Sequence, residues 1–188
     1  MKTVIYAIAT FALLVGCSKV LKPEDYYRFM DDKTKGPWTE LDLDLFHYSV
    51  QYRPIEYQLW MNYQELKTAE FEELKEASTG TEYYYLTVAS LSPDFEFPKP
   101  GDPLRAFLEF ELQSAFNLQI GSRSYQCQSY VYEPSYNLKP EAGFLLSFNV
   151  SDATQEARLL DFTCPFNNKK VRLELSNEQI TEVPTLNM

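Results

Sequence analysis

Apolar and polar residues alternate along most of the chain after residue 38, which is the pattern of half-buried β-strands. Residues 41–45 alternate leucine with acid, after which the phase shifts by one residue and apolar positions align again over 46–52. An alternation that changes phase once predicts a strand with a bulge, and Pro54 is expected to end it. Residues 55–63 also alternate and favour a second strand, with a helix carrying Ile55 and Leu59 as the alternative.

Further along the chain, short apolar stretches separated by turn residues predict more strands. They are Tyr83–Leu91, Ala106–Leu112, Phe116–Ile120, Arg123–Glu133, Phe144–Val150, Leu159–Cys164, Val171–Leu175 and Gln179–Val183. For the second of these stretches, a helix capped by Asp102-Pro103 is the alternative. Gly121-Ser122 suits a tight hairpin turn that pairs Leu118 with Tyr125.

One segment breaks this pattern and predicts a helix. Residues 64–78 are rich in strong helix formers, and Gly80 lies just beyond them, so a helix is expected over 66–78. Many short strands with frequent turns indicate an antiparallel fold. The chain is therefore expected to be mainly β, an antiparallel β-sandwich-like domain with one helix.

The N-terminus has the features of a secretory signal peptide. Lys2 precedes an apolar run over residues 4–15, which is too short to cross a bilayer, and Gly16 and Cys17 follow. The four residues LVGC (14–17) resemble the lipobox of bacterial lipoproteins. That resemblance implies cleavage after Gly16, acylation of Cys17 and, because serine follows the cysteine, an outer-membrane location.

The predicted organisation has three parts. Residues 1–16 are the signal peptide, and residues 17–38 are the lipidated cysteine with a polar tether in which a short helix after Pro23 is expected. Residues 39–188 form a single β-rich domain. With 45% hydrophobic and 15% aromatic residues, the chain can fill the core of one domain.

Charge and cysteine content narrow the expected partners and chemistry. The excess of 27 acidic over 17 basic residues argues against nucleic acid as a partner, because binding to it needs clustered positive charge.

Cys127 and Cys164 form an even pair in an exported domain, which favours a disulfide. Two buried thiols in neighbouring strands are the alternative.

Residues suited to catalysis or metal binding are few. The single histidine, His47, lies near Asp42 and Asp44, which are too close along the same strand to orient it easily for triad chemistry. Too few histidines and cysteines are available for zinc. Asp42, Asp44, Asp94 and Glu96 could in principle bind calcium. Acids that alternate along a strand are better explained as its solvent-exposed face. No catalytic residue, metal or cofactor is predicted.

Tyrosine is unusually frequent, with 14 residues. Tyr130 and Tyr132 are predicted to share one face of a strand with Gln126 and Gln128, and such a face can bind a sugar ring or another protein. Coverage of these rings by a second sheet or a helix is the alternative.

Several stretches resemble uncharacterised lipoproteins of Bacteroidota. They are VQYRPIEY (50–57), YYYLTV (83–88), FNLQIGSRSYQCQSYVYE (116–133), FLLSFNV (144–150) and VPTLNM (183–188), after the lipobox. The resemblance implies an outer-membrane lipoprotein with a β-leaning domain, and it implies no activity. The expected function is a lipid-anchored, non-enzymatic module that binds another envelope or surface protein, on either face of the membrane. A carbohydrate-binding lipoprotein is the alternative.

Overall fold

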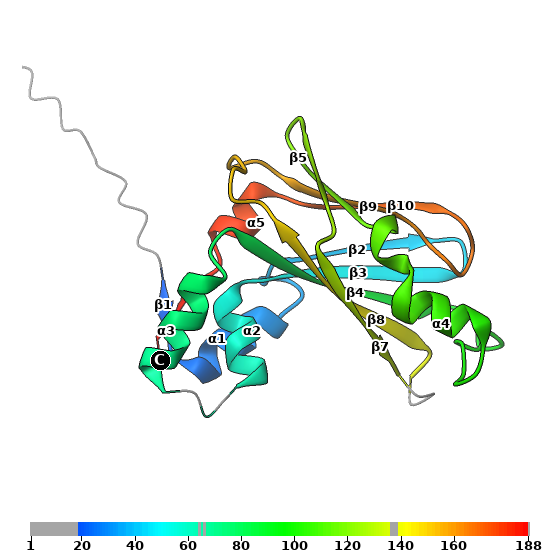
Figure 1. Cartoon of the computed structure of the whole chain (residues 1–188), viewed down its shortest axis with the longest axis horizontal. Coiled ribbons are helices and arrows are strands. Elements are labelled where there is room, and N and C mark those ends of the chain that lie inside the picture. The colour runs from blue at the N-terminus through cyan, green and yellow to red at the C-terminus, as the bar shows by residue number, and fades with distance from the viewer. Residues whose placement is uncertain (1–18, 64, 66, 136–138, 188) are drawn as a thin grey trace, which may run out of the picture.

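The computed structural model describes residues 19–187 except 64, 66 and 136–138. Its main body is a sandwich of two antiparallel sheets, with helices α1–α3 at one end and α4 at the other (Figure 1). With 38% strand and 27% helix, the prediction of a mainly β, sandwich-like domain is confirmed. The predicted signal peptide, Gly16 and Cys17 lie outside the described residues.

Each sheet has a simple strand order. In the five-stranded sheet the order is β2 (Trp38–Leu43), β3 (Phe46–Arg53), β4 (Thr81–Ser90), β8 (Glu141–Asn149) and β7 (Ser129–Pro134). In the four-stranded sheet it is β10 (Lys170–Leu175), β9 (Arg158–Thr163), β5 (Asn117–Ile120) and β6 (Arg123–Gln126). Alternate residues of both sheets point inward and fill one core, as strand geometry requires. Tyr48, Leu86, Phe144, Leu118 and Leu160 are fully buried examples.

The phase shift near residue 45 is a hairpin and not the predicted bulge. β2 and β3 pair so that Leu43 faces Phe46, which leaves Asp44 and Leu45 as a two-residue turn. Asp44 has φ +55°, a left-handed conformation that a short polar side chain tolerates better than most. The turn, rather than an extra residue in one strand, therefore changes the phase. Pro54 follows the last residue of β3, as predicted.

Three segments predicted as strands are helical. They are α2 (Ile55–Asn62), α4 (Pro103–Phe110) with a 3₁₀ turn at Leu112–Ala115, and α5 (Asn177–Thr181). Local capping explains two of them. The Asp102 carboxylate accepts a hydrogen bond from the Leu104 amide, and the Ser176 hydroxyl accepts one from the Gln179 amide. The predicted helix over 66–78 is confirmed as α3 (Thr68–Ala77).

The predicted tether is folded over the part that the structure describes, which corrects the domain boundary at residue 39. β1 (Val20–Leu21) pairs in parallel with β11 (Thr185–Leu186), and α1 (Pro23–Asp31) follows. Tyr26 and Met30 are one helical turn apart and both are fully buried. They pack with α2, α3 and β11 in a second, smaller core, so the folded body includes the described residues of the predicted tether.

Candidate functional site

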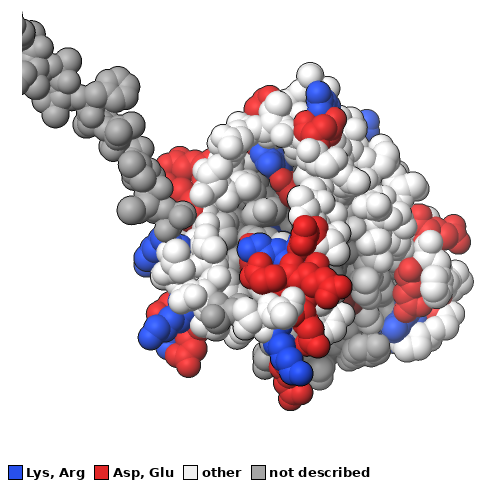
Figure 2. Space-filling model, turned by 60° about the vertical axis from the view of Figure 1, so that its left-hand side comes forward, with Lys and Arg blue, Asp and Glu red and all other residues white. Residues whose placement is uncertain are grey.

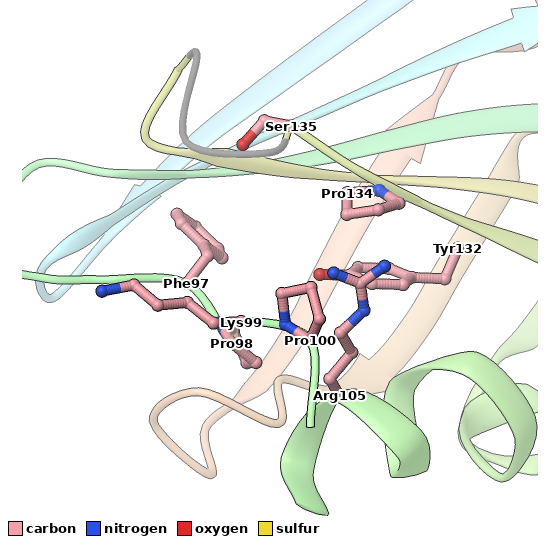
Figure 3. A pocket seen from close by; sticks show the side chains of 8 residues that line it. All are labelled: Phe97, Pro98, Lys99, Pro100, Arg105, Tyr132, Pro134 and Ser135. Atoms are coloured by element: carbon pink, nitrogen blue, oxygen red, sulfur yellow. The ribbon is translucent and has the colours of Figure 1, made fainter. Parts of the chain in front are cut away.

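A pocket of about 230 Å³ lies where the loop between β4 and α4 meets the end of β7 (Figure 3). The loop supplies one wall, α4 supplies Arg105, and the opposite wall comes from β7 and the residue after it. The lining residues are Phe97, Pro98, Lys99, Pro100, Arg105, Tyr132, Pro134 and Ser135.

The loop wall is held in place by aromatic packing. The rings of Phe95 and Phe97 meet edge to face with centroids 5.0 Å apart, and both pack against Phe166. Phe95 also packs against Phe46 of β3, with ring centroids 4.9 Å apart. Because each proline in the lining has a fixed φ, this wall needs little ordering when a ligand binds.

Arg105 brings a nearly enclosed cation to the pocket. Its side chain is 13% exposed, and its Nε atom lies 2.7 Å from the Glu109 carboxylate one turn later in α4. Figure 3 shows the guanidinium group next to the ring of Tyr132, whereas Lys99 extends away from them. A planar cation beside an aromatic ring can receive a carboxylate or another flat side chain.

The size of the pocket limits what it can hold. Pockets that enclose a metabolite or cofactor usually measure about 300–1,000 Å³. A pocket of about 230 Å³ is smaller than this range, so it suits a single side chain or a similarly small group.

The predicted face of Tyr130, Tyr132, Gln126 and Gln128 does not exist as one surface. The segment 123–133 breaks after Gln126, and its two halves join different sheets. Tyr130 is covered by α4, because its hydroxyl donates to the Leu108 carbonyl at 2.8 Å. Tyr132 packs on Phe144 with ring centroids 5.3 Å apart, and it reaches the pocket. Both glutamines stay exposed.

The pocket could not be found in the sequence as a set of residues. Only Tyr132 was singled out there, for an exposed face and not for a pocket wall. Its neighbours come from residues 97–105, which precede it by about thirty positions. The one available signal was the density of prolines and aromatic residues over 95–103, typical of a rigid loop.

The predicted disulfide is absent, and Cys127 and Cys164 are free, buried thiols. Cys127 follows β6 and Cys164 follows β9, and these strands flank β5 on opposite sides. Two strand spacings amount to about 9–10 Å, which exceeds the roughly 7 Å limit between bridged α-carbons. Burial raises the pKa of the Cys127 thiol to about 11, and its Sγ atom lies 3.1 Å from the Ser129 carbonyl oxygen.

His47 has closer acidic partners than the sequence suggested. The β2–β3 hairpin places Asp42 directly across from it, and their side chains meet at 2.6 Å through Nδ1. Its Nε2 atom lies 3.4 Å from Glu40, whose pKa is lowered mainly by a hydrogen bond from Lys33. Both ring nitrogens therefore face carboxylates, and these two contacts engage the imidazole.

Two of the acids considered for calcium are paired with lysines. Asp44 lies 3.7 Å from the Lys169 amine, and Glu96 lies 2.6 Å from that of Lys99. Within the described ranges, no three His, Cys, Asp or Glu side chains are grouped as metal ligands. In the same ranges, no helix is long and apolar enough to cross a bilayer.

The outward face of the five-stranded sheet carries one organised polar cluster. Arg53 lies 3.9 Å above the ring of Tyr85 and 5.5 Å from that of Tyr57. Burial lowers the pKa of this guanidinium, although the nearby Glu133 works in the opposite direction. The Tyr85 hydroxyl donates to Glu133 at 2.8 Å, so the cluster links β3, β4 and β7. These mutual contacts indicate a structural role.

The chain matches no known family model, no curated protein and no solved structure. Its function is therefore inferred from its own residues and geometry.

Proposed function

We propose that this chain is an outer-membrane lipoprotein, acylated on Cys17 after cleavage behind Gly16, whose sandwich binds a protein of the same envelope without catalysing a reaction. The observation that carries the proposal is the LVGC sequence at the end of the apolar run 4–15. A multiply acylated cysteine anchors a protein firmly, because each buried methylene contributes about 0.8 kcal/mol.

The pocket supports a protein partner over an enclosed small molecule. Its volume suits one inserted side chain, and the fixed φ of its prolines and the packing of its phenylalanines reduce the ordering that binding would require. The Arg105 guanidinium beside Tyr132 favours an acidic or aromatic side chain. The carbohydrate alternative is less well supported, since Tyr130 and Tyr132 present no open aromatic surface.

The anchor is tested with Cys17→Ala in the native host. We expect the variant to leave the membrane fraction, while the matched variant Cys127→Ala stays there, because that thiol is buried away from any processing site. Mass spectrometry should find an acylated cysteine at the new N-terminus of the wild-type protein. An intact Met1 or an unmodified Cys17 thiol would refute the proposal.

Binding is tested by cross-linking the lipidated protein in cells and isolating its complexes. Ser135→Trp places a large side chain in the pocket mouth, whereas Ser122→Trp adds the same bulk at the β5–β6 turn. We expect the first variant to lose the cross-linked partner and the second to keep it. Equal yields from both variants would exclude the pocket as the contact, and binding of the wild type on a glycan array would favour the carbohydrate alternative.

A further inference from the structure

The chain is bound into the domain very close to the proposed acylation site. The Lys19 carbonyl accepts a hydrogen bond from the Thr185 amide at 3.0 Å, and the Leu21 carbonyl accepts one from the Asn187 amide at 2.9 Å. The chain is therefore fixed to the domain two residues after Cys17. Two residues span at most about 7 Å, so an acylated Cys17 would hold this end of the domain at the bilayer surface.

The same end of the molecule exposes apolar side chains. Among the described residues, half of the exposed large apolar side chains lie in or beside β1 and α1–α3, and Val20 is 58% exposed. Figure 1 shows these elements together, at the end opposite α4. The residues are Val20, Tyr27, Met61, Tyr63 and Leu74. Tyrosine and tryptophan suit the bilayer interface, and Trp60 packs on Tyr27 with ring centroids 5.6 Å apart.

Charge on this end selects the kind of lipid surface. Lys19 and Lys22 flank Val20 and are exposed, so their amines can reach lipid phosphates while their aliphatic stems cover apolar surface. α3 exposes four glutamates, which are Glu70, Glu72, Glu73 and Glu76. Acidic side chains also gather on the face that Figure 2 turns forward. These carboxylates would be repelled by a strongly anionic layer.

We infer that the helical end formed by β1 and α1–α3 is a membrane-contacting surface that rests on a zwitterionic lipid layer and directs the α4 end away from it. This inference depends on the proposed lipid anchor. It adds that the acylated chain holds the domain in one orientation, with the pocket beside α4 available to partners.

The test uses single labelling sites on the full lipidated protein in phosphatidylcholine vesicles. Cysteines are introduced as Val20→Cys, Met61→Cys or Phe110→Cys and labelled with an environment-sensitive fluorophore. Phe110 lies in α4 and is 77% exposed, which makes it the matched control at the far end. Cys127 and Cys164 are buried, so they should not take the label in the folded protein.

On vesicles, we expect labels at positions 20 and 61 to shift to the blue and lose quenching by aqueous iodide, while the label at 110 does neither. Vesicles rich in phosphatidylglycerol should give less protection. If the protein floats with the vesicles but all three labels stay equally accessible, the orientation is refuted while the anchor stands. Stronger protection on phosphatidylglycerol would refute the zwitterionic assignment. If the protein does not float and Cys17 itself takes the label, the anchor fails.

Discussion

Replacing Glu82 with glutamine would remove the charge that compensates the buried guanidinium of Arg158. These residues come from β4 and β9, so their ion pair joins the two sheets. Their side chains are 11% and 9% exposed, and Nη2 of Arg158 lies 2.7 Å from Oε1 of Glu82. The Tyr84 hydroxyl donates to the other carboxylate oxygen at 2.5 Å. Burial alone would lower the pKa of Arg158, but the hydrogen bonds and charge of Glu82 outweigh it and raise that pKa.

The expected loss of stability follows from this burial. Removing one partner of a buried ion pair costs about 3–5 kcal/mol, because the remaining charge is left without compensation. Arg158 keeps hydrogen bonds to the carbonyls of Thr154 and Glu156, which still partly solvate its charge. We therefore expect a loss of stability at the lower end of this range, about 3 kcal/mol. For a domain of this size, about 1 kcal/mol lowers Tm by roughly 2–4 °C, so the loss corresponds to about 6–12 °C.

The assay is equilibrium urea unfolding followed by tryptophan fluorescence, for Glu82→Gln, Arg158→Met and the double variant. We expect the double variant to be less destabilised than the sum of the two single changes, because it leaves no buried charge unpaired. Asp161→Asn is the control, since the Asp161–Arg172 pair has a similar 2.6 Å contact but an exposed arginine, and it should change stability little. A loss below about 1 kcal/mol for Glu82→Gln would place the pair among solvated surface ion pairs and refute this account.

Three further predictions concern the buried residues Cys127, Cys164 and Gly143. Without reductant, Cys127 and Cys164 should resist thiol reagents in the folded protein and both react once it is unfolded; no reaction after unfolding would mean that they are bridged. Because burial raises the pKa of Cys127 from 9.0 to about 11, the folded state keeps a proton that the unfolded state loses, so stability should fall as pH rises from 9 towards 11. A Cys127→Ala variant should lose this part of the pH dependence in urea titrations. Gly143→Ala should cost about 1–3 kcal/mol, because the added β-carbon would lie 2.9 Å from Cζ of Tyr85, which Glu133 holds in place. The same change in a Tyr85→Ala background should cost less, and an equal cost in both would refute the proposed clash.

Local sequence determined much of the sandwich. A strict period of two fixes which residues of a strand face the core, so most strands and their buried positions were predictable. The Gly121-Ser122 turn also fixed a register, and Leu118 faces Tyr125 as expected. Strong helix formers over 64–78 were enough to predict α3, because that signal needs no distant partner. The LVGC motif on which the proposed anchor rests is likewise a property of the sequence itself.

Only the tertiary structure decided what depends on residues far apart in the chain. Residues 55–62 carry apolar side chains that fit either a strand or a helix, and packing against the second core selects the helix. The separation of Cys127 from Cys164 depends on β5 lying between β6 and β9, which neither cysteine encodes. Arg105 and Tyr132 line the same pocket because the loop between β4 and α4 meets the end of β7, the edge strand of its sheet. A local pattern sets which way a side chain points, but long-range strand order sets what it meets there.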